Sequence, residues 1–189
     1  MIRAALAVAL LGAGAACAQA PYAVEDLMHS LAAGGDSTVA FIETRHSSAL
    51  TTPLVTSGEL RYTRPAQLER RVQKPVEERY LVDGDRVTVE RKGAPTRTVS
   101  IASQPALGAF LESIRATLRG DLATLRRFYR VELEGAPTGW TLVLLPSDPG
   151  MAELVTVIRI GGVGGRLTGM EVLETGGDRV VTRFDEGAR

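Results

Sequence analysis

Two histidines are the residues of this sequence best suited to metal binding or acid–base chemistry. His29 falls on the polar side of an expected helix and His46 at the end of an expected strand, and neither has a third ligand at metal-site spacing. Ser47 and Ser48 follow His46, but no strand-to-helix turn surrounds them of the kind that exposes a serine nucleophile. We therefore expect both histidines to be solvated, and no metal site.

A glycine-rich segment and several carboxylates are the other candidates for chemistry. Residues 161–165 read Gly-Gly-Val-Gly-Gly, but no Lys-Ser/Thr follows, so a turn between strands is favoured over a phosphate-binding loop. Glu77, Glu78, Asp83 and Asp85 are scattered along strand ends, where solvated charges are the usual arrangement. No catalytic residue and no cofactor is predicted, and the protein is not expected to be an enzyme.

Arg64 is the one charged residue in an unexpected place. It shares the parity of Leu60 and Tyr62 along an alternating strand, which puts it on the apolar face just before Pro65. Two interpretations stay open. Either the strand has ended and Arg64 turns to solvent, or its guanidinium lies at the rim of an interior and donates to the unpaired carbonyls that end the Leu107–Leu118 helix.

The first twenty residues have the form of a secretory signal peptide. Arg3 precedes an apolar run from Ala4 to Ala16, and residues 18–20 supply the small-x-small cleavage pattern. We expect cleavage after Ala20 and a periplasmic location. Cys17 leaves an alternative open, because the run before it resembles a lipoprotein box, although the box normally has an aliphatic residue where a glycine stands here.

Composition narrows the class of protein. About 169 residues remain after cleavage (21–189), which is the size of one domain. That chain has no cysteine, so no disulfide can stabilise it. The full sequence has 22 basic and 22 acidic residues and no basic stripe interleaved with aromatics, so no nucleic-acid partner is expected. No second apolar run approaches membrane-spanning length.

Hydrophobic periodicity predicts a helix and then strands in the first half of the domain. Apolar residues between Val24 and Leu31 have helical spacing, and the helix should end at Gly34-Gly35. Alternating segments separated by turn signals such as Asp83-Gly84 then predict an antiparallel meander. The expected strands are Thr38–Arg45, Gly58–Arg64, Gln67–Gln73, Arg79–Asp83, one containing Val87 and Val89, and Thr96–Ile101.

The middle of the sequence changes to helical period. An apolar stripe from Leu107 to Leu118 predicts a helix that begins near Pro105 and ends at Gly120, and Asp121 can cap a second helix up to Phe128. Five more strands are expected at Tyr129–Glu134, Gly139–Leu145, Leu154–Ile160, Arg166–Glu174 and Arg179–Phe184. The fold class is therefore α+β, with one long antiparallel sheet that curls to protect its edges.

The strand from Trp140 to Leu145 is apolar on both faces, so something should cover each of them. Two helices over the concave face of the curled sheet would cover one face and enclose an apolar interior. From periodicity alone, that interior is either an ordinary packed core or a cavity.

Short segments span the mature chain in a recognisable order and spacing. They are Phe41-Ile42-Glu43, Gly58-Glu59-Leu60, Tyr62-Thr63-Arg64-Pro65, Pro75, Val82-Asp83-Gly84-Asp85, the helices from Pro105 to Phe128, Trp140-Thr141-Leu142, Leu145-Pro146 and Gly177-Asp178. This pattern resembles the LolA-like family of periplasmic outer-membrane lipoprotein carriers. The resemblance implies an incomplete antiparallel β-barrel of about eleven strands with a helical lid over a hydrophobic cavity. The family's arginine before proline, which contacts the lid, falls on Arg64.

The resemblance also implies cargo and partners. The cargo would be lipoprotein acyl chains or another apolar, lipid-like molecule such as a free lipid or a pigment-like polyene, carried toward the outer membrane by a monomer. The implied partners are an inner-membrane release complex and an outer-membrane acceptor. The predicted ligand-binding residues are Phe41, Leu60, Tyr62, Arg64, Tyr80, Val82, Phe110, Leu111, Ile114, Leu118, Trp140 and Leu142.

Two other hypotheses stay open. The first is a membrane-anchored acceptor or lipid-sensing domain of the same fold, which acylation of Cys17 would favour. The second is a plain structural or enzymatic domain.

Overall fold

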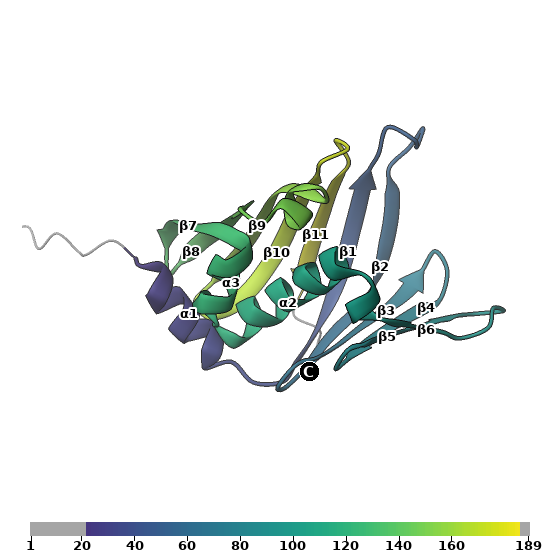
Figure 1. Cartoon of the computed structure of the whole chain (residues 1–189), viewed down its shortest axis with the longest axis horizontal. Coiled ribbons are helices and arrows are strands. Elements are labelled where there is room, and N and C mark those ends of the chain that lie inside the picture. Colours follow the sequence, from purple (N-terminus) through teal and green to yellow (C-terminus); the bar gives the residue numbers. More distant parts are fainter. Residues whose placement is uncertain (1–21, 186–189) are drawn as a thin grey trace, which may run out of the picture.

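The computed structural model describes residues 22–185, whose strands form one antiparallel sheet of eleven strands (Figure 1). The helices are α1 (Val24–Ala32), the 3-10 helix η1 (Ile101–Ser103), α2 (Pro105–Arg119), α3 (Leu122–Phe128) and α4 (Pro149–Ala152). The strands are β1 (Ser37–His46), β2 (Leu54–Thr63), β3 (Gln67–Lys74), β4 (Glu78–Asp83), β5 (Arg86–Arg91), β6 (Arg97–Ser100), β7 (Tyr129–Ala136), β8 (Gly139–Pro146), β9 (Val155–Val163), β10 (Arg166–Glu174) and β11 (Arg179–Asp185). The predicted signal peptide and Cys17 lie outside the described residues.

The sheet consists of two meanders joined at one pair of strands. Its order is β6-β5-β4-β3-β2-β1-β11-β10-β9-β8-β7, so every neighbour is consecutive in the chain except β1 and β11. These two strands pair antiparallel with Phe41 opposite Phe184. The sheet stays open between β6 and β7, as expected for an incomplete barrel. We call β1–β6 the N-terminal half of the sheet and β7–β11 the C-terminal half.

The strand register identifies which side chains share the helix-covered face. Leu142 lies opposite Ile160, and Ile160 lies opposite Met170. The row continues through Thr182 to Glu43. Because side chains alternate along each strand, this row fixes the parity of every strand that it crosses. We call this face the inner face and the opposite one the outer face.

The core of the protein lies between the helices and the C-terminal half of the sheet. Figure 1 shows the helices on one side of the curled sheet, with α2 running from α1 toward β3. Within the core, Trp140 donates its indole N–H to the Gly164 carbonyl at 2.8 Å, and its ring packs on Gly162, where a side chain would collide with it. The core cluster is Leu27, Met28, Leu31, Ala116, Leu125, Tyr129, Trp140, Leu142, Leu144, Met151, Val155, Ile158, Ile160, Val172 and Val180.

A glycine allows the two longest helices to meet. Gly120 ends α2 in the left-handed conformation, and a Cβ there would lie 2.0 Å from the Met28 carbonyl oxygen of α1. Asp121 then caps α3, as predicted, by accepting from the Thr124 N–H at 3.0 Å. The packing of α2 against α1 thus depends on a residue without a side chain.

Three local predictions differ from the structure. The second strand begins at Leu54, because its first residues pair with β1 although they do not alternate. Ile101 does not end β6 but begins η1, since its carbonyl accepts from the Gln104 N–H at 2.9 Å. The short helix α4 was not predicted; Asp148 caps it, and its Met151 is fully buried.

Candidate functional site

The inner face of the N-terminal half carries apolar side chains that the helices cover only in part. We call them the N-terminal inner surface. None of them belongs to the core cluster. Four of these side chains are buried and form the floor of the surface, whereas the others keep some solvent contact. The buried members are Phe41, Tyr62, Val72 and Val82, and the half-buried ones are Val39, Leu60, Leu68, Tyr80, Val87, Val89 and Val99.

The helix α2 has the same incomplete burial on one of its faces. Its fully buried side chains are small or polar, including Ser113, Ala116 and Thr117, and they face the core. The larger stripe that predicts this helix is half-buried instead, and of its members only Phe110 packs against the core cluster. The others are Leu107, Leu111, Ile114 and Leu118.

The contacts of Arg115 show which part of the sheet the apolar stripe of α2 faces. At 100° per residue, the stripe lies between Arg115 and the side of α2 that contacts the core. The Arg115 guanidinium donates from Nε to the Ala66 carbonyl at 2.7 Å and from Nη2 to the Gly84 carbonyl at 3.2 Å. These carbonyls belong to the β2–β3 and β4–β5 turns, at one end of the N-terminal half. The stripe of α2 therefore faces the N-terminal inner surface.

Arg115 was missed by the sequence analysis, although it is the most deeply placed cation of α2. Arg115 is only 7% exposed, and both hydrogen bonds of its guanidinium go to backbone carbonyls of turns. A planar guanidinium spreads its donors over three nitrogens, so it can reach acceptors in two separate turns at once. Arg115 thus anchors α2 to the N-terminal half through hydrogen bonds to two of its turns.

The prediction that Arg64 would bind the end of α2 was wrong. Its Nη2 donates to the Ala32 carbonyl, the last of α1, at 2.5 Å. Its backbone N–H donates to the Asp36 carboxylate at 2.9 Å. β2 ends at Thr63, so Arg64 belongs to the turn beside the C-terminus of α1, where a cation is favourable. Arg64 is exposed, yet it binds the C-terminus of α1. The cation that connects α2 to the sheet is Arg115, which belongs to α2 itself.

A second missed residue is Arg70, whose guanidinium lies on the inner face of β3. Its Nη2 donates to the Glu43 carboxylate at 2.9 Å and to the Thr56 hydroxyl at 3.3 Å. The guanidinium carbon lies 4.9 Å from the centre of the Phe41 ring and 5.9 Å from that of Tyr80. These are cation–π distances, so both rings contribute to holding the guanidinium on the inner face.

Polar groups continue on both sides of Arg70. The Tyr80 hydroxyl donates to Glu78, which is also paired with Arg91. The hydrogen bond from Tyr80 lowers the pKa of the Glu78 carboxyl despite its partial burial, and Arg91 lowers it further. On the other side, Thr182 donates to Glu43 at 3.2 Å. A transverse polar row therefore crosses the inner face from β11 to β5.

The structure divides the predicted ligand-binding residues into groups. Trp140, Leu142 and Phe110 belong to or pack against the closed core, and Arg64 holds α1. The other members lie on the N-terminal inner surface or on the α2 stripe that faces it: Phe41, Leu60, Tyr62, Tyr80, Val82, Leu111, Ile114 and Leu118. Their binding of cargo stays a prediction.

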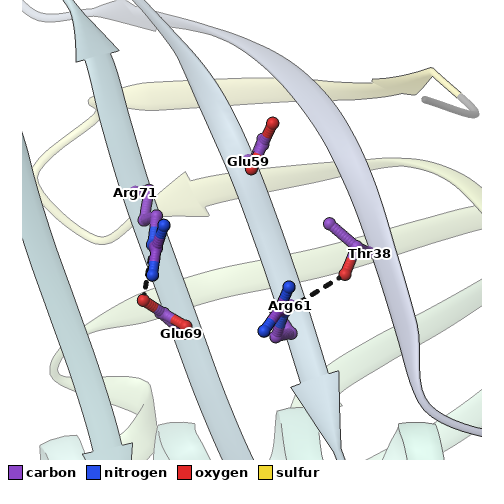
Figure 2. A pocket seen from close by; sticks show the side chains of 5 residues that line it. All are labelled: Thr38, Glu59, Arg61, Glu69 and Arg71. Atoms are coloured by element: carbon purple, nitrogen blue, oxygen red, sulfur yellow. Dashed lines mark hydrogen bonds and ion pairs between the residues drawn. The ribbon is translucent and has the colours of Figure 1, made fainter. Parts of the chain in front are cut away.

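The outer face carries a small polar hollow instead of an apolar one. Figure 2 shows it between β1, β2 and β3, with Glu69 and Arg71 joined by an ion pair and Arg61 donating to Thr38. Its volume of about 10 Å³ is no more than one water molecule needs. We assign no ligand to this site.

The described residues show no arrangement that suits a metal ion or a membrane span. His29 and His46 are both exposed. Within residues 22–185, no three His, Cys, Asp or Glu side chains gather so that they could hold a metal ion. In the same range, no helix combines the length and apolarity needed to cross a bilayer.

Comparison with known proteins identifies the family. The model of a family described as outer membrane lipoprotein carrier protein LolA-like matches residues 15–189. The chain belongs to this family. No curated protein sequence matches this LolA-like protein.

Several solved structures are similar to this LolA-like protein at low sequence identity. A LolA superfamily protein from Nitrosomonas europaea is 11% identical, with 86% of this chain and 89% of that chain covered and a TM-score of 0.45. The lipoprotein LppX of Mycobacterium tuberculosis is 13% identical, with coverages of 88% and 96% and a TM-score of 0.44. A chain of the Pseudomonas aeruginosa MucA/MucB complex is 11% identical, with coverages of 87% and 57% and a TM-score of 0.45.

Proposed function

We propose that this protein is a periplasmic carrier that binds the acyl chain of a lipoprotein or of another lipid-like molecule between the N-terminal inner surface and α2. One observation carries the proposal. Apolar side chains on both sides, such as Leu60 and Tyr80 on the sheet and Ile114 on α2, face the same space and are only half-buried. Proteins rarely leave facing apolar surfaces unfilled, so such a pair suits an apolar ligand.

The energetics of release favour this site over the closed core. Burying a 16-carbon chain contributes on the order of 12 kcal/mol before any opposing terms, at roughly 0.8 kcal/mol per methylene. A carrier has to release its cargo, so part of that energy must be offset by a change in the protein. Displacing α2 would break the hydrogen bonds of Arg115 to two turn carbonyls. The free energy lost with these bonds would offset part of the free energy gained by burying the chain.

The cargo site that we propose is narrower than the one predicted from sequence. Leu60, Tyr80, Leu111, Ile114 and Leu118 would contact the chain. Phe41, Tyr62 and Val82 would form the floor of the site. We propose a binding protein, not an enzyme, that exchanges cargo with an inner-membrane release complex and an outer-membrane acceptor.

Binding of an uncharged, environment-sensitive fluorescent lipid tests the proposal. We expect one saturable site. Ile114→Asp should weaken binding by at least about 10-fold, because a carboxylate would then face the acyl chain. The matched control is Ile42→Asp, a residue that is 50% exposed on the outer face and should bind as the parent does. Equal binding by a folded Ile114→Asp protein would contradict the proposal.

The mass of the N-terminus separates the carrier from an anchored acceptor. We predict a mature protein that begins at Pro21 without lipid, because residues 18–20 form the better processing signal. A diacylated N-terminal peptide beginning at Cys17 would instead favour the acceptor, which a lipid chain and a second signal can hold on a membrane. Mass spectrometry of protein purified from a periplasmic and a membrane fraction makes the measurement.

A further inference from the structure

The N-terminal inner surface changes from apolar to charged along its strands. Next to the turns that bind Arg115, the cross-strand neighbours are Tyr62, Leu68, Val82 and Val87, all apolar or aromatic. The next row toward the other end of the strands is mixed, and the row after it contains a Glu–Arg pair. In order across the sheet, these two rows are Leu60, Arg70, Tyr80, Val89 and Arg97, then Val72, Glu78 and Arg91.

The charged end carries three arginines on the strands β3, β5 and β6. Arg70, Arg91 and Arg97 lie on the inner face there, against the carboxylates of Glu43 and Glu78. The ion pairs of Glu43 with Arg70 and of Glu78 with Arg91 leave the guanidinium of Arg97 without a partner among the described residues. Arg97 is therefore a cation at this end of the surface that no nearby carboxylate of the described residues neutralises.

Arg70 keeps donors available although it is paired. Its hydrogen bonds to Glu43 and Thr56 both use Nη2, so Nε and Nη1 have no partner within residues 22–185. The side chain remains 30% exposed, and its guanidinium lies over the rings of Phe41 and Tyr80. A guanidinium with free N–H groups can form charge-assisted hydrogen bonds to an oxyanion.

Stability alone does not account for these charges. Ion pairs removed from water are commonly no more stabilising than apolar side chains of similar volume. The corresponding inner positions of the C-terminal half include Leu142, Ile160 and Met170, which contribute to or pack against the core. The polar row therefore suggests recognition of a ligand rather than support of the sheet.

We infer that the cargo is an amphipathic lipid with an oxyanion head, a carboxylate or a phosphate, whose tail lies under α2 and whose head binds Arg70 with Arg97 close by. This inference rests on the proposed function and names the chemical class of its cargo. The apolar row beside Arg115 receives the tail, and the head stays at the open end, where the arginines are more exposed. Glu43 competes with the head for Arg70.

Competition experiments with lipids of equal chain length test the inference. Palmitate and hexadecyl phosphate carry an oxyanion, whereas monopalmitoylglycerol is uncharged, and each displaces the uncharged fluorescent lipid used above. We expect the two anions to compete at about 10-fold lower concentration than the uncharged lipid, as one charge-assisted contact would give. Inorganic phosphate at the same concentrations should not displace the probe, because it has no tail.

Substitutions of Arg70 and of Glu43 should change the preference for anionic lipids in opposite directions. Arg70→Gln should abolish the preference for anions, whereas Glu43→Gln should increase it several-fold because Arg70 loses its competitor. The double variant Glu43→Gln with Arg70→Gln, in which neither member of this pair is charged, should bind all three lipids alike. The matched control is Arg71→Gln, the next residue of β3, which lies on the outer face, is ion-paired with Glu69 and should keep the preference.

The outcomes separate this inference from the proposed function. If the fluorescent lipid does not bind at all, both are wrong. If it binds but anionic and uncharged lipids compete equally, only the oxyanion head is wrong. A loss of preference in Arg71→Gln as large as in Arg70→Gln, or displacement by inorganic phosphate, would likewise overturn it.

Discussion

The two halves of the sheet have the same alternation of apolar residues but differ in what covers their inner face. In the C-terminal half, α1, α3 and α4 contribute buried side chains such as Leu27, Leu125 and Met151 to one closed core. The N-terminal half faces only the partly buried stripe of α2, and residues such as Leu60 and Tyr80 keep solvent contact. An alternating strand therefore predicts an apolar face, and the helices decide whether that face becomes a core or a binding surface.

The halves also differ in polarity. Among the described residues, the buried polar side chains on the inner face of the C-terminal half, such as Thr182, are uncharged, and Thr182 donates to Glu43 on β1. The N-terminal half adds the ion pairs of Arg70 and Arg91. Charged groups thus occur on the inner face where the helices give less cover and water still reaches the side chains.

The largest effect that distinguishes the halves should come from truncating one leucine in each. Leu142 is completely buried in the core, so Leu142→Ala should reduce the free energy of unfolding by about 2–5 kcal/mol. Leu60 is half-buried, so Leu60→Ala should cost about 1 kcal/mol or less while weakening lipid binding. Chemical denaturation measures both. Equal losses of stability would mean that the N-terminal half is packed as tightly as the other.

The anchors of the two long helices give the next effect. Arg115→Met removes two hydrogen bonds from a charged donor, which should reduce the local stability of α2 by about 1.5–3 kcal/mol and raise amide hydrogen exchange in that helix. Arg64→Leu should raise exchange at the end of α1 and leave α2 unchanged. Faster exchange of α2 in Arg64→Leu than in Arg115→Met would contradict this assignment of the anchors.

The smallest expected effect is a pH dependence that comes from the N-terminal half. Burial of the Glu69 carboxyl would raise its pKa, but hydrogen bonds from Arg79 and Arg71 outweigh burial and lower it below the ordinary value of 4.5. A lowered pKa in the folded state stabilises the protein above the ordinary value, and this stability is lost as the pH falls through the folded value.

A glutamine variant isolates that contribution. Glu69→Gln should be less stable than the parent by about 1 kcal/mol or less at pH 7, because the partner arginines are near the surface. The difference should close once the pH is well below 4.5, when the parent carboxyl is also uncharged. Denaturation midpoints of both proteins across this range make the test, and a difference that grew in acid would have the wrong sign.

Much of the fold could be predicted from the sequence because its signals are local. Alternation and the Asp83-Gly84 turn predict the meander, and Asp121 and Gly120 predict the ends of α3 and α2. The pairing of β1 with β11 could not be predicted from a local pattern, since it joins residues near opposite ends of the domain. The first residues of β2, before Gly58, were not predicted, because they form a strand through pairing with β1 and not through alternation.

The site was harder to predict, because strand alternation was used to place only one charged side chain, that of Arg64. Arg70 lies between Leu68 and Val72, which share a face of the predicted strand, so the argument made for Arg64 would have placed Arg70 inward too. Arg115 carries no such signal, because it lies beside the apolar stripe of its helix. Its carbonyl partners belong to turns far away in sequence, and only the folded chain brings them together.

Photo-crosslinking tests most directly whether cargo binds the N-terminal half. Palmitate with a diazirine in its chain would be bound, irradiated and mapped by peptide mass spectrometry. Our account predicts labels on α2 and on β2–β4, in peptides that contain Leu111, Leu60 or Tyr80, and a loss of these labels in Ile114→Asp. Labels concentrated on β8 around Trp140 and Leu142 would contradict it, because the cargo would then enter the core that the structure shows closed.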